Sequence, residues 1–379
     1  MILRLAKKSD VDFYYKLVNN SSVRLNSINK DKIQFSEHKK WFYSKVKSED
    51  SLLFVLKNEN ELVGQIRFDK VYNSWEIDYS ISDLYRGEGY GYQILLKGIF
   101  EVYYRVNSKV NFTGKVLEAN KISAKIFQRI GFELSKFEII NNDKLLIYSL
   151  EHKPITNILL SSRNWNYSIL KRIKSKLKGS NWLYCNNKTE FSKIYLDVVK
   201  PSKVFIPHWS YIIPENIYMN FQCIVFHMTD LPFGRGGSPL QNLIERGYKE
   251  TKISALRVSR GIDTGPIYFK KNLSLHGTAQ EIYLRASQVV KDMIIYIEEN
   301  EIQPIEQEGL SVDFSRRTPE MSSLEGVDDF EKLYDYIRML DADGYPKAYI
   351  ENENFRFEFT RATIKTDKSI IADVRIIKK

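Results

Sequence analysis

The sequence contains few cysteines and no long hydrophobic run. The two cysteines among its 379 residues, Cys185 and Cys223, both lie within apolar sequence (WLYC and FQCIVF), so we expect buried thiols rather than a disulfide. No apolar stretch approaches the roughly 18 residues that a membrane helix needs. The opening MILRLAKKSD turns polar too early for a secretory signal. These absences predict a cytoplasmic protein with no membrane partner.

Metal-binding and nucleic-acid-binding motifs are also missing. No group of His, Cys and acidic residues has the spacing of a metal site, so no metal is predicted. The formal net charge is +10, but basic residues alternate with acids, as in KNENELVG and KVKSED. Zinc-finger spacing, an aromatic RNA-binding motif and a basic tail are all absent. The charge therefore indicates either solvated lysine-rich faces or attraction of phosphate-bearing small ligands, and no nucleic-acid partner is predicted.

The chain has enough apolar sequence for several folded domains. With 43% hydrophobic and 13% aromatic residues, a length of this order predicts two to three domains of roughly 100–200 residues each. A strand-like run, KLLIYSLE, ends at a polar junction over residues 151–154. A strand pattern, ITNILLS, and a basic amphipathic helix pattern, SILKRIKSKLKG, then open a new α/β unit. We predict domains at 1–153, 154–308 and 309–379.

A glycine-rich loop precedes a helix in the first domain. Residues 86–91, RGEGYG, follow a strand-like alternation and lead into an apolar helix pattern. Glycines at such a junction let backbone N–H groups turn toward a ligand, and the helix N-terminus adds partial positive charge. The loop is therefore either a cradle for a pyrophosphate or a plain tight turn.

A second segment, LEANKISAKIFQRIGF (117–132), runs from a strand into a helix that ends at Gly131. In order and spacing, the two segments resemble the acetyl-CoA-binding motifs of GCN5-related N-acetyltransferases (GNAT). The earlier stretch VRLNSINKDKIQFSEHKKWF is similar to members that acetylate amines of nucleotide-activated sugars. The resemblance covers roughly residues 1–150 and implies a mixed α/β GNAT fold. It places acetyl-CoA against Arg86, Gly87, Gly89, Gly91, Asn120 and Ser123.

One catalytic position departs from that family. Relatives often carry a tyrosine, the proton donor to the CoA thiolate, where this chain has Phe127. The candidate bases for the attacking amine are Glu37, His38, Glu76 and Glu118, and for each of them alone an ordinary surface or capping role is the favoured interpretation. The domain is thus predicted either to acetylate or to serve as a binding or dimerisation module.

The stretch CIVFHMTDLPFGRGGSPLQNLIERG (223–247) places a histidine at the end of an apolar strand. His227 is followed by a glycine- and proline-rich loop, which is where α/β folds place ligand chemistry. The next helix is predicted to begin with a capping box, with Ser238 at the N-cap, Pro239 at N1 and Gln241 at N3, and to stop at Gly247. Alone, His227 would more often be structural.

A second segment supplies an acid. Asp263 lies in SRGIDTGPI (259–267), between two strand-like runs. A carboxylate near an imidazole fixes its tautomer and favours its protonated form. The pair suits attack of an amine on a carbonyl, because the imidazole takes the proton and steadies the oxyanion.

Together these segments resemble the 10-formyltetrahydrofolate-dependent formyltransferases, over roughly residues 155–365. The match rests on His227, Leu231-Pro232, Arg235-Gly236, residues 263–266 (DTGP) and the C-terminal run RML…GYPKA. It implies a Rossmann-like core with a small C-terminal subdomain and 10-formyltetrahydrofolate as donor. It assigns His227 and Asp263 to catalysis and places Arg235, Gly236 and His208 near the donor, although His208 with Trp209 could equally be packing residues.

The family's Asn-x-His unit is replaced here by Val225-Phe226-His227. Valine cannot donate to the formyl oxygen, and losing such a donor typically costs roughly 2.7–4 kcal/mol of transition-state stabilisation. A backbone N–H, Thr229 or protonated His227 is expected to take over.

The acceptor is predicted to be a small nucleotide-linked amino sugar, most specifically a UDP-4-amino-4,6-dideoxy sugar. Arg316 and Arg317 are candidates for its diphosphate, and Tyr345 for stacking on its base, although loop and packing roles explain them as well. Two alternatives stay open: formylation of methionyl-tRNA, and a formyltransferase whose N-terminal half is a non-catalytic scaffold. A homodimer is a further expectation.

Overall fold

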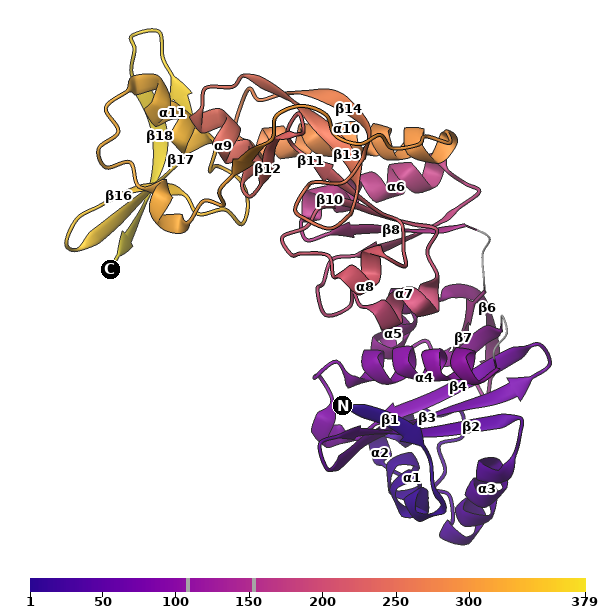
Figure 1. The fold of residues 1–379 in the computed structure, drawn as a ribbon. Helices are drawn as coiled ribbons and strands as arrows, with labels where there is room; N and C mark the ends of the chain where they lie inside the picture. The colour runs from indigo at the N-terminus through magenta and orange to yellow at the C-terminus, as the bar shows by residue number, and fades with distance from the viewer. Residues whose placement is uncertain (107–109, 152–154) are drawn as a thin grey trace. The chain divides into compact units, whose positions relative to one another are not determined.

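The computed structural model describes residues 1–106, 110–151 and 155–379. The chain forms two compact units, one of Met1–Pro154 with Ser192–Lys200 and one of Ile155–Phe191 with Pro201–Lys379 (Figure 1). Most of the predicted junction at 151–154 lies outside the described residues, and the predicted boundaries at 153 and 308 stay predictions. The predicted α/β class, a GNAT-like unit followed by a Rossmann-like core with a C-terminal subdomain, is confirmed.

The first unit is built on a seven-stranded sheet in the order β1-β2-β3-β4-β5-β7-β6. Neighbouring strands are antiparallel except for β4 and β5, which are parallel. The strands are β1 (Ile2–Leu5), β2 (Ser51–Asn58), β3 (Glu61–Val71), β4 (Ser74–Ile81), β5 (Asn111–Leu117), β6 (Glu133–Ile140) and β7 (Asp143–Leu150).

The two parallel strands separate along their length. Their pairing runs from Ser74 opposite Asn111 to Ile77 opposite Gly114, yet β4 continues to Ile81 and β5 to Leu117. β4 leads through a short 3-10 turn and the glycine loop into α4 (Tyr90–Val106), and β5 leads into α5 (Lys121–Ile130). The N-termini of both helices therefore follow the separated strand ends.

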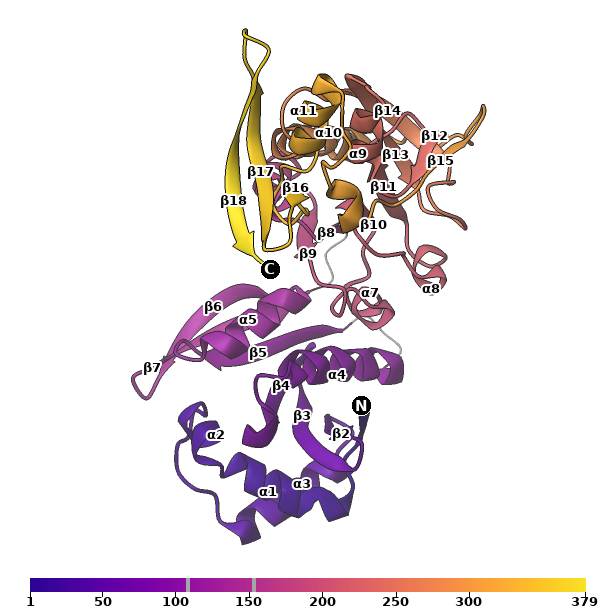
Figure 2. The same ribbon diagram turned by 90° about the vertical axis from the view of Figure 1, so that its left-hand side faces the viewer.

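Helices cover both faces of this sheet. α4 lies on one face, and α1 (Val11–Val18) and α3 (Phe35–Lys47) lie on the other (Figures 1 and 2). The apolar positions of α4 recur at helical spacing, and the side chains of Tyr92, Leu95, Leu96, Ile99 and Val102 are buried. The helix α2 (Ser21–Leu25) precedes α3, and α7 (Lys193–Val199) belongs to this unit although its sequence lies between strands of the second.

The second unit contains a six-stranded sheet in the order β14-β13-β11-β10-β8-β9. Its strands are β8 (Thr156–Ser161), β9 (Asn181–Cys185), β10 (Lys203–His208), β11 (Cys223–His227), β13 (Glu250–Arg257) and β14 (Ile267–Ser274). β9, β8, β10 and β11 are parallel, whereas β13 and β14 are antiparallel. The chain order reverses between β8 and β10, and open α/β sheets bind ligands outside the carboxyl ends of the strands at such a switch point.

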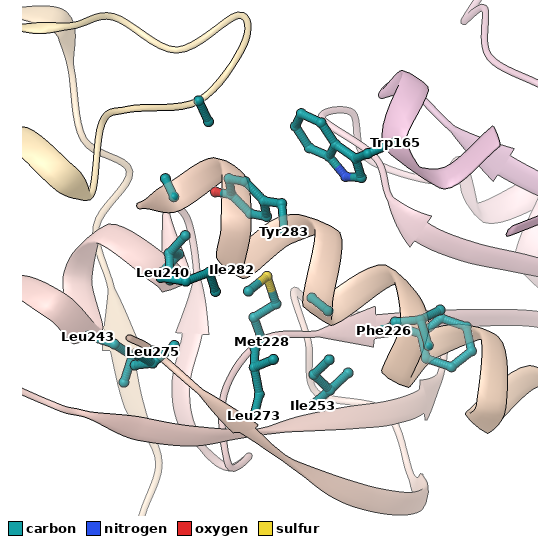
Figure 3. Close-up of a cluster of buried hydrophobic side chains, with 14 of the residues drawn as sticks. Trp165, Phe226, Met228, Leu240, Leu243, Ile253, Leu273, Leu275, Ile282 and Tyr283 are labelled. Carbon is teal, nitrogen blue, oxygen red and sulfur yellow. The ribbon is translucent and has the colours of Figure 1, made fainter. Parts of the chain in front are cut away.

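One hydrophobic core joins the sheet to its helices. α6 (Tyr167–Lys176) and the long α10 (Ala279–Glu299) pack on the sheet, and Figure 3 shows side chains such as Phe226, Ile253 and Ile282 meeting in the core. Both cysteines are buried, in β9 and β11, as predicted.

The C-terminal segment packs against the same core. It consists of α11 (Phe330–Arg338) and an antiparallel sheet of β16 (Ala348–Glu351), β17 (Phe355–Ile364) and β18 (Ile370–Lys378). Buried Ile337, Met339 and Leu340 share the core with Leu240 and Leu243 of α9. The small C-terminal subdomain that the resemblance implies is therefore present.

The start of α9 (Pro239–Glu245) corrects one prediction. Pro239 opens the helix and Gly247 follows its end as expected, but no capping box forms. Ser238 adopts a left-handed conformation with φ 49°, and its side chain makes no cap hydrogen bond. Its hydroxyl instead accepts from Arg317 N at 3.1 Å, and Gln241 donates to Met339 O at 3.0 Å. Tertiary partners have displaced the local motif.

Candidate active sites

His227 ends β11 at the edge of the sheet where the strands' carboxyl ends meet, and it is buried. Its Nε2 lies 2.7 Å from Gly234 O, and its Nδ1 lies 3.4 Å from Asp263 Oδ2. A carbonyl oxygen can only accept, so the short contact requires a proton on Nε2. In the neutral ring Nδ1 is then the basic atom, and protonation there creates a cation facing a carboxylate.

Asp263 is held from two sides. It lies in the turn between β13 and β14 with φ 53°, a conformation that non-glycine residues rarely adopt. Its Oδ2 accepts a 3.0 Å hydrogen bond from Gly236 N. The structure thus brings together His227 and Asp263, the two residues predicted to be catalytic, and orients the carboxylate by a backbone donor.

Thr229 does not occupy the position predicted for a replacement oxyanion donor. The residue is completely buried, and its hydroxyl donates to Gly234 O at 3.3 Å. Val225 lies on the same face of β11 as His227, because strand residues two apart share a face, and its cross-strand neighbours are Ile206 and Leu256. Neither side chain therefore offers a free donor to a formyl oxygen, and both ring nitrogens of His227 already face Gly234 O and Asp263.

Arg235 and Gly236, predicted to lie at the donor, act within the protein instead. They belong to β12 (Phe233–Gly236), which pairs with β15 (Val312–Phe314). The Arg235 guanidinium donates to Gln307 Oε1 from Nε at 3.2 Å and from Nη2 at 2.7 Å. Gly236 N is committed to Asp263. Gly236 therefore fixes Asp263 directly, and Arg235 anchors β12 to Gln307.

His208 ends β10 beside the switch point and belongs to an aromatic cluster. Its ring packs edge-on against Trp165 and Tyr283, with centroids 5.6 and 5.9 Å away. Burial and the nearby charge of Arg163 lower the pKa of His208 to about 4, so the ring is neutral at physiological pH. A neutral ring at this place is compatible with a donor pocket and with packing.

Tyr345, predicted to stack on a base, is engaged inside this cluster. Its ring stacks on Tyr283 at 5.4 Å, the two hydroxyls lie 2.8 Å apart, and the Arg163 guanidinium lies 5.0 Å from its centre. The structure gives Tyr345 a packing role.

Arg316 and Arg317 have different environments. Arg317 forms an ion pair with Glu245, Nη1 to Oε2 at 2.5 Å, and its side chain is only 6% exposed. Burial by itself would raise the pKa of Glu245, but hydrogen bonds from Tyr336 and Arg317 lower it on balance. Arg316 is exposed, and its backbone lies against Gly237, beside the β12 residues that hold Asp263. Of these two arginines, Arg316 is the exposed one.

In the first unit, the glycine loop has the geometry of a phosphate cradle. Gly87 and Gly89 have φ of 86° and 80°, and a Cβ at either position would meet no atom within 4 Å. Their backbone therefore faces open space ahead of α4. Gly91 differs, since a Cβ there would lie 2.9 Å from Ile126, so this glycine allows α4 to approach α5. Arg86 pairs with Asp83 at 2.7 Å and braces the loop.

The second GNAT motif segment caps the N-terminus of α5, and its Ser123 contacts Tyr79. Asn120 Oδ1 accepts from Ser123 N at 3.1 Å, and Ser123 Oγ lies 3.0 Å from the hydroxyl of Tyr79. Tyr79 lies in the part of β4 that has separated from β5. Burial raises the pKa of Tyr79 to about 12, although the Ser123 hydrogen bond opposes the shift. The hydroxyl therefore stays protonated at neutral pH.

Phe127 is a core residue. Its ring is 2% exposed, it stacks on Tyr148, and a Cβ at Gly114 would overlap the ring tip. A tyrosine hydroxyl at position 127 would point into the β5 backbone. The ring of Tyr79 packs against Phe127 with centroids 6.0 Å apart, so Tyr79 is the protonated hydroxyl beside this position.

The four candidate bases are not brought together. His38 is buried among aromatic rings, burial lowers its pKa, and neither ring nitrogen has a hydrogen-bond partner among the described residues. Glu118 pairs with Lys144, which lowers the pKa of Glu118, and Glu76 pairs with Lys115, each at 2.8 Å. Glu37 lies exposed in the first turn of α3. None of the four is identified as the base by its geometry.

Tyr79 and Gln307 are the functional candidates that the sequence analysis missed. Tyr79 reads as an ordinary strand residue, and Gln307 lies in a polar segment without periodicity. The parallel pairing of β4 with β5 is the feature that would have identified Tyr79.

Among the residues that the structure describes, no three or more His, Cys, Asp or Glu side chains group together as metal ligands would. In the same residues, every helix is too short or too polar to cross a membrane.

Comparisons with known proteins agree with both units. Residues 1–133 match the model of the acetyltransferase (GNAT) domain, and residues 319–377 match that of the methionyl-tRNA formyltransferase C-terminal domain. A solved structure titled methionyl-tRNA formyltransferase from Clostridium thermocellum is 48% identical, with a TM-score of 0.58. The match covers 59% of this chain and 100% of that one.

Curated relatives are more distant. The methionyl-tRNA formyltransferases of Rickettsia massiliae and of Wolbachia pipientis are each 26% identical, over 47% and 43% of this chain. The chain spans only 64% and 55% of the length of these two proteins.

Proposed function

Because the chain belongs to the formyltransferase family and carries a GNAT acetyltransferase domain before it, we propose that it formylates the amine of a nucleotide-linked amino sugar. The donor is 10-formyltetrahydrofolate, and the acceptor class is a UDP-4-amino-4,6-dideoxy sugar. The N-terminal unit acetylates an amine of a similar sugar from acetyl-CoA. The observation that carries the formyl-transfer assignment is the contact between His227 Nδ1 and Asp263 Oδ2, at the carboxyl end of β11.

The residues near the switch point fit a folate. Beyond His208, the exposed loop carries Tyr211 and Ile212, and the rings of Trp209 and Tyr211 lie 5.3 Å apart. Flat apolar side chains beside a neutral imidazole suit a pterin ring. When bound, the folate supplies an activated formyl group on a weakly basic arylamine nitrogen.

His227 is proposed to manage the proton of the acceptor amine. As the amine nitrogen bonds to the formyl carbon, Nδ1 accepts the proton that the amine loses, and Asp263 stabilises the resulting imidazolium. The same imidazolium then gives its proton to the departing arylamine nitrogen as the bond from that nitrogen to the formyl carbon breaks. The proton that the acceptor amine loses thus ends on the departing arylamine nitrogen, and no further reactant is needed.

Arg316 supports a phosphate-bearing acceptor. It is exposed beside Gly237 and the strand that holds Asp263, and a guanidinium binds phosphate oxygens in bidentate fashion. Arg317 is excluded from this role by its ion pair with Glu245.

The first unit is proposed to hold acetyl-CoA at the loop of Gly87 and Gly89, whose backbone faces open space. Acetyl-CoA supplies an activated acetyl group when bound. We assign to Tyr79 the proton-donor role for which Phe127 has no hydroxyl. The Tyr79 hydroxyl adjoins Ser123 of the second motif, where the strands part.

A second acceptor is methionyl-tRNA, favoured by the names of the relatives. Purified full-length chain is incubated with UDP-4-amino-4,6-dideoxy sugars and each acyl donor, and the products are weighed by mass spectrometry. A formyl gain that His227→Ala abolishes supports the sugar proposal. No gain with any sugar, together with formylation of methionyl-tRNA that weakens as salt rises, would replace it.

A further inference from the structure

Gln307 connects three parts of the formyltransferase site through one side-chain amide. Its Nε2 donates to the carbonyl oxygens of Asp263 and Gly265, both at 2.8 Å. Its Oε1 accepts the two hydrogen bonds from Arg235 at 3.2 and 2.7 Å. Every strong hydrogen-bonding direction of the amide is therefore used, and the contacts fix which end is nitrogen.

The segment that carries Gln307 is itself anchored. It follows α10, and Ile305 exchanges two backbone hydrogen bonds with Ile267 at the start of β14, at 2.7 and 2.9 Å. Ile267 closes the turn that contains Asp263. The amide is thus presented to the turn from a fixed backbone.

The catalytic turn needs such support. Asp263 has φ 53°, a left-handed conformation that is unfavourable for a non-glycine residue and persists only where its surroundings hold it. Gln307 holds the backbone of the residue through its carbonyl. Through Arg235 it also restrains β12, where Gly236 N binds the Asp263 carboxylate. Backbone and side chain of Asp263 are therefore both tied to the same amide.

We propose that Gln307 is a positioning residue that sets the distance and orientation of the Asp263 carboxylate relative to His227. It touches neither reacting group and acts through Asp263. The inference deepens the proposed formyl transfer and rests on it for its effect on rate. Its effect on the His227–Asp263 contact can be measured without turnover.

The decisive variant is Gln307→Glu. Glutamate keeps the length and the acceptor for Arg235 but cannot donate to the carbonyls of Asp263 and Gly265, so it repels the turn. Arg235→Met removes the other half of the connection. The matched control is Gln288→Glu, because Gln288 Oε1 also accepts from an arginine, Arg172 at 2.9 Å, in an exposed pair remote from these residues in sequence.

The first readout is the NMR signals of the His227 imidazole in the full chain at one fixed pH, assigned with His227→Ala. Asp263 is the acid that faces the ring, while the Gly234 carbonyl and the Thr229 hydroxyl near it are uncharged. Displacing that carboxylate in Gln307→Glu is therefore expected to shift the ring signals of His227, whereas Gln288→Glu leaves them unchanged.

The second readout is formyl transfer at saturating substrate. We expect kcat to fall about 10-fold to 100-fold in Gln307→Glu, with KM within about twofold, because orientation rather than binding is lost. A purely structural role would lower the unfolding temperature and leave the His227 ring signals in place.

Each outcome decides one question. A Gln307→Glu chain whose His227 ring signals match those of the wild type overturns the positioning role, whatever the rate. A wild-type chain that formylates no acceptor overturns the proposed function alone, since the ring signals still report whether Gln307 controls the pair.

Discussion

The carboxylate of Asp263 and the imidazole of His227 face each other across 3.4 Å, Oδ2 to Nδ1, although His227 ends β11 and Asp263 lies in the turn between β13 and β14. The same carboxylate oxygen is fixed by Gly236 N at 3.0 Å, and the other ring nitrogen contacts Gly234 O. One short strand, β12, thus orients both residues. The chemistry of the pair consequently depends on charge at Asp263 and on the geometry of β12.

Replacing Asp263 by Asn tests the charge alone, because it removes the negative charge and keeps the shape of the side chain. The amide oxygen can still accept from Gly236 N, but it cannot stabilise an imidazolium, so we expect kcat for formyl transfer to fall about 10²–10⁴-fold. The measurement is a single-turnover assay with the purified acceptor. Asp230→Asn is the control, because Asp230 pairs with Lys252 and Lys270 and not with His227. Equal rates for Asp263→Asn and the wild type would refute the pair.

Local patterns in the sequence predicted the elements that position this pair. Apolar runs with strand period ended at His208 and His227, and turn residues surrounded Asp263, so these residues were expected at strand ends. The family resemblance added their catalytic roles. Neither source predicted the Ser238 conformation or the Thr229 hydrogen bond, since both depend on partners far away in sequence.

The missed residues illustrate the same limit. Gln307 acquires its importance only when a polar segment after α10 returns to the Asp263 turn. Tyr79 is distinguished from other strand tyrosines by the separation of β4 from β5, which no periodicity encodes.

Val225→Asn tests the missing oxyanion donor. Position 225 shares a strand face with His227, so an amide there would lie beside the proposed reaction centre. If no side chain now makes the contact with the formyl oxygen, adding a donor should raise kcat by up to about 10²–10³-fold, the equivalent of the roughly 2.7–4 kcal/mol typical of such a group. Val225→Thr, which keeps the β-branched shape, serves as the comparison. A kcat that does not rise in Val225→Asn would show that another donor already holds the oxyanion.

Substitutions of the neighbouring Arg316 and Arg317 should affect acceptor binding and protein stability separately. Arg316→Ala is expected to raise KM for the nucleotide-linked acceptor about 10-fold without changing the unfolding temperature, because the side chain is exposed. Arg317→Met should leave KM unchanged and cost about 1–3 kcal/mol of stability, since Glu245 loses a buried partner. Steady-state kinetics and thermal unfolding check the two. A raised KM in Arg317→Met, with KM unchanged in Arg316→Ala, would instead place the phosphate at Arg317.

Stability should depend on pH through His208. Its pKa is about 4 in the folded chain and about 6.5 when unfolded, so the unfolded state binds more protons between these values. The contribution is complete above pH 6.5 and is lost as pH falls toward 4, by on the order of 3 kcal/mol. His208→Phe keeps the aromatic contacts, and its unfolding temperature should fall less than that of the wild type between pH 7 and 4.5. His276→Gln, at an exposed site, should follow the wild type.

Tyr79→Phe should abolish one reaction and leave the other intact. The phenol stays protonated because burial raises its pKa to about 12, and its loss removes the proton donor beside Ser123. We expect acetyl transfer to fall about 10²-fold or more. Formyl transfer by the same sample is the internal control for folding, since His227 and Asp263 lie in the other unit.

The double variant Tyr79→Phe, Phe127→Tyr makes the test more specific. A hydroxyl at position 127 would meet the Gly114 backbone, so this variant should not recover acetyl transfer. Recovery would instead mean that the ring at 127 faces the thioester and that Tyr79 only packs against it. A wild-type chain that binds CoA but never consumes acetyl-CoA would favour the scaffold alternative, because the cradle at Gly87 and Gly89 would then bind without catalysing.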